Sequence, residues 1–97
     1  MDNIIITGSD KECEIAGDGF RYKFRNGHPV EIIIGGEKQE AIPLPEADGK
    51  PMKPKAKLVH KYWDSALVIT KYTKGLKKIE VKYHILSTGE MKKETLF

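Results

Sequence analysis

Histidine, cysteine and serine are the residue types in this sequence that could ligate a metal or act as a nucleophile. The three histidines, His28, His60 and His84, lie on separate segments without HxH or HExxH spacing. No serine has a G-x-S-x-G context, and no glycine-rich loop precedes a predicted helix. We therefore expect no metal, no cofactor and no catalytic residue, and we predict that the protein is not an enzyme.

Cys13 is the only cysteine, so no disulfide can form within the chain, and we predict a buried, apolar role for it on a strand. The first residues lack the basic segment and long apolar core of a secretory signal, so a cytoplasmic location is the default expectation. An exported mature fragment would look the same. The longest aliphatic runs, Ile4 to Ile6 and Ile32 to Ile34, are far too short to span a membrane.

Length and charge limit the organisation of the chain. At 97 residues it forms one domain, 1–97, with one modest core. Residues 1–49 carry five basic and ten acidic side chains, a net charge of −5, whereas residues 50–97 carry twelve lysines and four acids, a net charge of +8. This asymmetry points to an anionic partner or to head-to-tail self-association, although lysines also protect sheet edges from aggregation.

Asp18-Gly19 predicts a two-residue type I′ hairpin turn. Closing this turn matches apolar with apolar and acidic with basic side chains: Gly17 with Phe20, Ile15 with Tyr22, Cys13 with Phe24, Glu14 with Lys23 and Glu12 with Arg25. Both faces of the hairpin are consistent in this register. We expect it to form the centre of the N-terminal half.

Asn26-Gly27 predicts the next turn, but a two-residue turn would mix apolar and charged faces. We therefore prefer a three-residue loop, Arg25 to Gly27, with a bulge at Gly27. That register pairs Tyr22 with Val30, Phe20 with Ile32, and Arg21 with Glu31. Residues 38–42 can then pair back as a short strand.

Proline-rich residues 43–54 contain four of the five prolines and predict a loop or extended connector. A lid over a pocket is the functional alternative, because long loops without secondary structure are uncommon unless they have a function. Residues 55–62 alternate again and predict another strand.

The last third of the chain predicts a three-stranded meander. A three-residue loop, Ser87-Thr88-Gly89, pairs Ile85 with Met91 and Lys82 with Glu94, and so turns a set of apolar residues inward: Ile79, Val81, Tyr83 and Ile85. At Lys74-Gly75 this set can face either Leu67 and Ile69 or Val68 and Thr70, and we favour the first pair. The whole pattern predicts an all-β fold, an antiparallel up-and-down meander of about eight strands forming a small barrel or strongly curled sheet without substantial helix.

The segment from Trp63 to Met91 resembles the C-terminal meander of fatty-acid-binding proteins and of small bacterial lipocalin-like domains. The likeness lies in an aromatic turn, a Leu-Val-Ile-Thr strand, a glycine turn, a longer strand and Ser-Thr-Gly. It implies a lipocalin-like β-barrel domain. Three features of those families are missing: the helical lid, the Arg-x-Tyr pair of the last strand and the N-terminal Gly-x-Trp. The resemblance therefore implies the shape and not fatty-acid binding.

Aromatic residues supply the candidate site. Tyr22, Phe24, Tyr62, Trp63 and Tyr83 are our candidates for lining a ligand pocket, although a filled interior is favoured over a hollow one in so small a barrel. We predict a non-enzymatic binding module that takes a small apolar or amphipathic ligand, or a protein partner, through the barrel mouth and the proline loop.

The alternative function uses the lysine-rich C-terminal half, with Trp63, Tyr72 and Tyr83 interleaved, to bind anions or single-stranded nucleic acid. Arginine, the better stacking and phosphate-binding residue, is absent from that half, so nucleic acid is the less favoured partner. A homodimer through edge strands or through the oppositely charged halves is the remaining expected association.

Overall fold

The computed structural model describes residues 4–96, and within them every regular element is a β-strand. Eight strands have four or more residues: β1 (Ile5–Gly8), β2 (Glu12–Gly17), β3 (Phe20–Arg25), β4 (His28–Ile34), β8 (Lys53–Lys61), β9 (Ser65–Lys74), β10 (Lys77–Leu86) and β11 (Met91–Leu96). Three further strands have two residues each: β5 (Glu37–Lys38), β6 (Glu46–Ala47) and β7 (Lys50–Pro51). The predicted all-β fold is confirmed.

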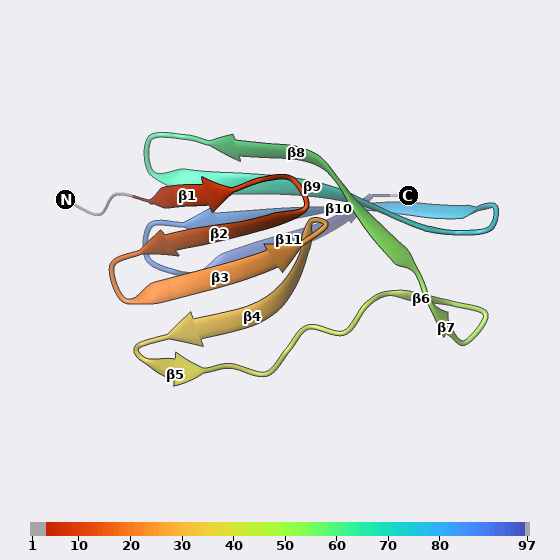
Figure 1. Ribbon diagram of the computed structural model, residues 1–97, viewed down its shortest axis with the longest axis horizontal. Helices are drawn as coiled ribbons and strands as arrows, with labels where there is room; N and C mark the ends of the chain where they lie inside the picture. The colour runs from red at the N-terminus through yellow and green to blue at the C-terminus, as the bar shows by residue number, and fades with distance from the viewer. Residues whose placement is uncertain (1–3, 97) are drawn as a thin grey trace.

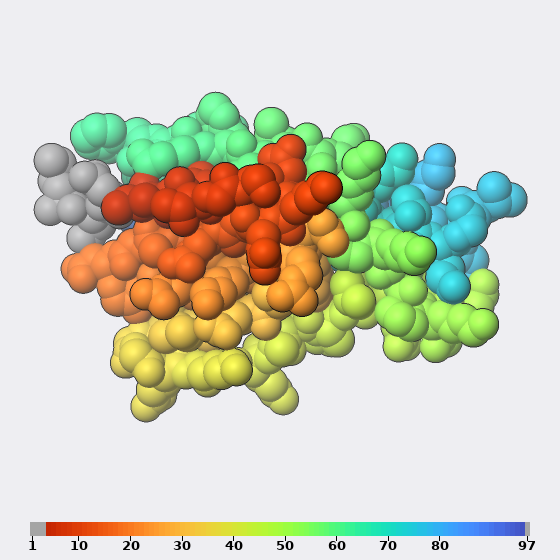
Figure 2. Space-filling view, in the orientation of Figure 1, coloured from red at the N-terminus to blue at the C-terminus, as the bar shows by residue number. Residues whose placement is uncertain are grey.

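The strands form two layers, which Figure 1 shows one in front of the other. The N-terminal sheet has the order β1-β2-β3-β4-β5 and the C-terminal sheet the order β11-β10-β9-β8, while β6 and β7 pair as a separate small hairpin. All of these pairings are antiparallel, as predicted. The two sheets are not joined into a closed barrel. Figure 2 shows the N-terminal sheet covering one face of the molecule.

The Asp18-Gly19 hairpin forms in the predicted register, with Ile15 opposite Tyr22 and every other expected pair in place. Some ion pairs form between residues that are not directly opposite each other. Arg21 Nε lies 3.1 Å from a carboxylate oxygen of Glu14, although Glu14 is opposite Lys23. Lys23 instead approaches Glu31 on the next strand, at 3.8 Å. The backbone register is therefore set by the turn and the apolar face, since neighbouring charges can re-pair across it.

The predicted three-residue loop at Asn26-Gly27 is wrong. Arg25 pairs with His28 across a two-residue turn, and the extra residue, Val30, bulges out between the pairs that follow. The bulge restores the match between faces, so Tyr22 pairs with Ile32 and not with Val30. Asn26 and Gly27 both have positive φ, at 51° and 84°, as a type I′ turn requires.

In the C-terminal sheet one predicted register is confirmed and one is wrong. Ser87-Thr88-Gly89 is a three-residue loop with Ile85 opposite Met91, and the inward set of β10 is half-buried at Ile79 and buried at Val81, Tyr83 and Ile85. At the other end Lys74 pairs with Lys77, which leaves the two residues Gly75 and Leu76 in the turn. This loop length turns Val68 and Thr70 inward in place of Leu67 and Ile69.

The proline-rich segment is more structured than the predicted loop. Residues 39–45 have no regular structure, but β6 and β7 close around Asp48-Gly49, and β8 already begins at Lys53. The Met52 N–H donates to the Pro45 carbonyl at 2.8 Å, and Ala47 and Met52 are buried. The short strand expected over 38–42 is reduced to β5, which pairs only through Glu37 and Lys38.

The core lies between the sheets and draws on both. Phe24 of β3 meets Tyr83 of β10 edge to face, with the ring centroids 5.8 Å apart. Cys13 is buried on β2, as predicted. Hydrogen bonds also cross between the sheets: the Tyr22 hydroxyl donates to the Gly89 carbonyl at 2.6 Å, and the Thr70 hydroxyl donates to the Gly27 carbonyl at 2.5 Å. The interior thus combines apolar packing with polar bridges.

Gly27 lies where the two sheets approach each other, and we expect Gly27→Ala to be more destabilising than Gly19→Ala. Both glycines have positive φ, which costs an alanine about 1 kcal/mol. A Cβ on Gly27 would also overlap the Thr70 side chain and lie 3.0 Å from the Ala56 Cα, whereas a Cβ on Gly19 would meet nothing. Overpacking should add about 1–3 kcal/mol for Gly27→Ala, measured by urea unfolding. Equal losses for the two variants would contradict the sheet packing described here.

Candidate functional site

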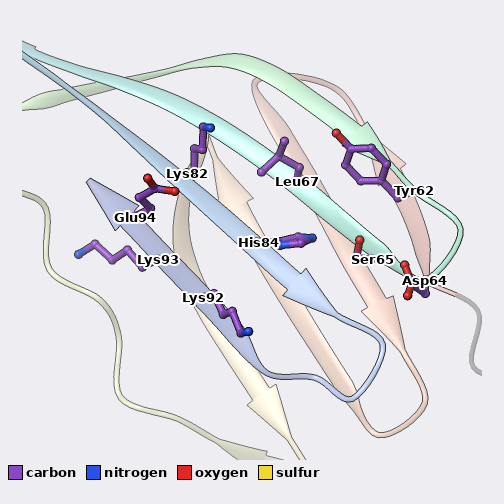
Figure 3. Close-up of a pocket in the computed structure, with 9 residues that line it drawn as sticks. All are labelled: Tyr62, Asp64, Ser65, Leu67, Lys82, His84, Lys92, Lys93 and Glu94. Carbon is purple, nitrogen blue, oxygen red and sulfur yellow. The ribbon is translucent and has the colours of Figure 1, made fainter. Parts of the chain in front are cut away.

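A groove crosses the outer face of the C-terminal sheet. It has a volume of about 560 Å³ and is open to solvent, and Figure 3 shows the side chains that line it: Tyr62, Asp64, Ser65, Leu67, Lys82, His84, Lys92, Lys93 and Glu94. These residues come from three of the four strands of the sheet, β9, β10 and β11, and from the turn after β8. We call this feature the outer-face groove.

Strand register places the groove residues in rows. Leu67 of β9 lies between His60 of β8 and His84 of β10, and Lys92 of β11 continues this row. In the next row, Ile69 lies between Leu58 of β8 and Lys82 of β10, and Glu94 of β11 follows. Alternation along each strand turns all of these side chains away from the core. Within these two rows, the apolar side chains lie on β8 and β9 and the charged side chains lie on β10 and β11.

Exposure of apolar and aromatic groups marks the β8 side of this face. Leu58 is 44% exposed and Tyr62 46% exposed, and the rings of His60 and Tyr62 meet edge to face with centroids 4.5 Å apart. Beside them, Trp63 is 79% exposed at the tip of the β8–β9 turn. Side chains of this kind offer flat and apolar contact area to a ligand without a large loss of conformational entropy.

The five predicted pocket residues do not lie together. Tyr22, Phe24 and Tyr83 are buried between the sheets, where their rings fill the core. Tyr62 borders the outer-face groove, and Trp63 lies next to it on the surface. Tyr72, named with Tyr83 for the alternative nucleic-acid surface, is also buried, so neither ring is available to stack on a base.

A buried hydrogen-bonded chain that the sequence did not reveal joins the two sheets. His28, 5% exposed, lies with Nδ1 2.7 Å from the Tyr72 hydroxyl, and the Tyr72 hydroxyl in turn bonds to that of Tyr83. His28 Nε2 lies 2.8 Å from the Ile42 carbonyl. Because that carbonyl can only accept, Nε2 carries the hydrogen, and Nδ1 of the neutral ring accepts from Tyr72. The Tyr83 hydroxyl then donates to the Tyr72 oxygen.

Burial shifts the pKa of each member of this chain in the direction that favours the neutral form of the side chain. Desolvation lowers the pKa of His28, the charge of Lys93 lowers it further, and the hydrogen bond to Ile42 opposes the shift. Desolvation also raises the pKa of Tyr72 and of Tyr83. The chain is therefore uncharged near neutral pH, which suits a structural bridge better than acid–base chemistry.

The groups that could ligate a metal or act as a nucleophile in the described part of the chain include the free thiol of Cys13. Desolvation, with a smaller contribution from Asp10, raises the pKa of the Cys13 thiol and so disfavours the reactive thiolate. Among residues 4–96, no group of three or more His, Cys, Asp and Glu side chains is arranged to hold a metal ion. The outer-face groove is instead lined by apolar, aromatic and cationic side chains beside two carboxylates.

No protein-family model matches this chain, and no curated protein or solved structure is significantly similar to it. The likeness to lipocalin-like domains therefore stays a prediction. Within the described residues, no helix is long and apolar enough to cross a membrane.

The lowered pKa of His28 predicts that the protein loses stability in mild acid. Unfolded histidine titrates near pH 6.5, so below this pH the unfolded chain binds more protons than the folded one. The free energy of unfolding should be highest above about pH 6.5 and fall toward the folded pKa, with a slope of at most about 1.4 kcal/mol per pH unit. Urea unfolding at several pH values measures the slope.

The matched variants for this pH dependence are His28→Gln and His60→Gln, since His60 is an exposed histidine. His28→Gln should flatten the acid slope even if it lowers stability at neutral pH. His60→Gln should keep the slope of the wild type. An unchanged slope in His28→Gln would show that protonation of other groups causes the acid sensitivity.

Proposed function

We propose that this protein is a non-enzymatic binding module and that its ligand is a small amphipathic anion held in the outer-face groove. The observation that carries the proposal is the division of the groove into an apolar, aromatic side at Tyr62 and Leu67 and a cationic side at Lys82 and Lys92. A ligand with an aromatic or aliphatic body and one anionic group matches both sides.

Packing of the interior supports placing the ligand on the outer face. The sequence suggested a barrel mouth, but the two sheets do not close, and the rings of Tyr22, Phe24 and Tyr83 occupy the space between them. The hydroxyl groups inside are also engaged with partners from the opposite sheet or the same layer. By contrast, Leu67 and His84 are only half-buried and face the solvent side of the sheet.

Charge supports an anionic ligand over a neutral one. The groove contains Lys82, Lys92 and Lys93 against the carboxylates of Asp64 and Glu94. The excess positive charge lies on β10 and β11, across the sheet from the Tyr62 ring. The lysines there can bind the anionic group of the ligand while its apolar body lies over Leu67. Such an arrangement fixes the orientation of the ligand as well as its charge.

Anilinonaphthalene sulfonate, an aromatic anion, is the probe for this proposal. We expect the folded protein to enhance its fluorescence in a saturable titration. Leu67→Glu should weaken binding at least about tenfold, because it removes apolar contact and adds a like charge. Lys82→Gln should weaken it about threefold to tenfold by removing one cation.

Matched controls come from the outer face of the N-terminal sheet. Val30→Glu adds the same carboxylate at an exposed apolar position, and Lys23→Gln removes a half-exposed lysine. Both should bind the probe as the wild type does, and circular dichroism should show that all variants remain folded. Equal losses in groove and control variants, or no probe binding by the folded protein, would overturn the proposal.

Single-stranded nucleic acid is the second candidate, favoured by the rings of His60, Tyr62 and His84 on the same sheet face as Lys71, Lys82 and Lys92. Exposed rings that stack on bases beside lysines that contact phosphates are the usual elements of such a surface. The burial of Tyr72 and Tyr83 removes two of the rings that the sequence offered.

A salt titration separates this candidate from the first. If the outer face binds nucleic acid, a fluorescent oligothymidylate should bind with an affinity that falls steeply as salt rises, by about 0.7 log units per log unit of salt for each phosphate contact. Tyr62→Ala should weaken binding without changing that slope, and Lys82→Gln should reduce the slope. An absence of binding at low salt would remove nucleic acid from consideration.

A further inference from the structure

The hairpin formed by β9 and β10 extends beyond β11, the strand at one edge of its sheet, while β8 on the other side pairs with β9 as far as Thr73. Both strands have ten residues, while the pairing with β11 reaches only Glu80 in the described part of the chain. Figure 1 shows the turn between them at one extreme of the long axis, beyond the end of the N-terminal sheet. We call residues 74–78 (Lys-Gly-Leu-Lys-Lys) the hairpin tip.

Leu76 lies at the end of the hairpin tip and is 98% exposed, more than any other large apolar residue described. Nothing in the fold requires leucine there, because the side chain packs on neither sheet. The tip turn itself is closed by the Lys74 and Lys77 pair. A fully exposed leucine at the end of a projecting hairpin can enter an apolar phase when that end of the protein meets it.

Lysines surround this leucine on both faces of the sheet. Lys74 and Lys77 lie on the face that bears the core, and Lys78 lies on the outer face. The strand next to the tip adds Lys53 opposite Thr73 and Lys55 opposite Lys71. The tip therefore presents cations in every direction around the leucine.

Few acids neutralise this end of the molecule. Residues 46–57 and 71–80, which form it, contain eight lysines and three carboxylates, a net charge of +5. Asp48 binds Lys77 at 3.1 Å, and Glu80 pairs with Lys57, so these carboxylates are already engaged. In Figure 2 the tip lies beside the β6–β7 hairpin at the same end, so the charge is gathered on one surface.

We propose that the hairpin tip is a docking site for an anionic bilayer surface, with Leu76 entering the interface and the surrounding lysines contacting lipid head groups. Charge complementarity supplies the long-range attraction, because anionic lipids attract basic segments close to their surface. The exposed leucine can be buried only by a partner that has an apolar region next to its negative charge. A bilayer has such a region, whereas a small soluble anion does not. The convex shape suits a deformable flat surface. A protein partner would need a concave acidic pocket deep enough for one leucine.

The experiment compares sedimentation of the full chain with phosphatidylcholine vesicles that contain or lack phosphatidylserine. The wild type should bind only the phosphatidylserine vesicles, and added salt should release it. Leu76→Ser should weaken binding about tenfold through the lost apolar contact. Lys74→Gln with Lys78→Gln should weaken it about fivefold for each lysine.

Control variants change the same residue types at the N-terminal sheet. Ile5→Ser removes another well-exposed apolar side chain, and Lys11→Gln with Lys38→Gln removes two exposed lysines. These should bind vesicles as the wild type does. Lys74 is half-buried and the other substituted side chains are exposed, so each variant is expected to fold, which circular dichroism checks.

A fluorescent reporter tests the orientation. Trp63 is the only tryptophan and lies at the opposite end of β9 from the tip. In Trp63→Phe with Leu76→Trp, emission should shift to the blue on addition of phosphatidylserine vesicles, whereas Trp63 in the wild type should not shift. The proposal is overturned if the wild type does not bind these vesicles at low salt or if the tip and control variants bind alike. Binding to polyglutamate without binding to vesicles would also overturn it and would favour an acidic protein.

Discussion

Polar contacts between the two sheets are the constraint on which the rest of the structure depends. His28 must meet Tyr72, and the Thr70 hydroxyl must meet the Gly27 carbonyl, because a buried polar group without a partner costs about 1–3 kcal/mol. Apolar faces alone could slide over one another, but these directional bonds are satisfied in one relative placement. No buried side-chain nitrogen or oxygen of residues 4–96 lacks a partner. The interior is therefore filled by side chains whose polar groups are paired.

Local turn chemistry accounts for the parts of the fold that could be predicted from sequence. Asp18-Gly19 and Ser87-Thr88-Gly89 each fix both a turn and the alternation on both sides of it, so their registers were predicted correctly. Around Asn26-Gly27 the pattern required one extra residue but did not locate it, and the bulge forms at Val30. In β9 every residue from Leu67 to Thr70 is apolar or β-branched, so only the length of the next turn decides the inward face.

The candidate site was less predictable because it depends on contacts between distant strands. Tyr62 was selected for its aromatic character and does border the groove. Lys82 and His84 belong to the groove only because strand pairing sets them beside residues of β9 and β11. His28 follows a turn in the sequence, and no local pattern points to its partner Tyr72, which lies 44 residues away on the other sheet. Alternation reports which face a side chain takes, and it carries no information about what packs against that face.

Residues 39–52 are the only covalent connection between the sheets, since each sheet is formed by one continuous stretch of chain. The sheets therefore relate to each other as the subunits of a heterodimer, and the connection acts as a tether that raises their effective concentration. His28 bonds to the Ile42 carbonyl within the tether. The same side chain therefore joins the two sheets and fixes the position of the segment that connects them.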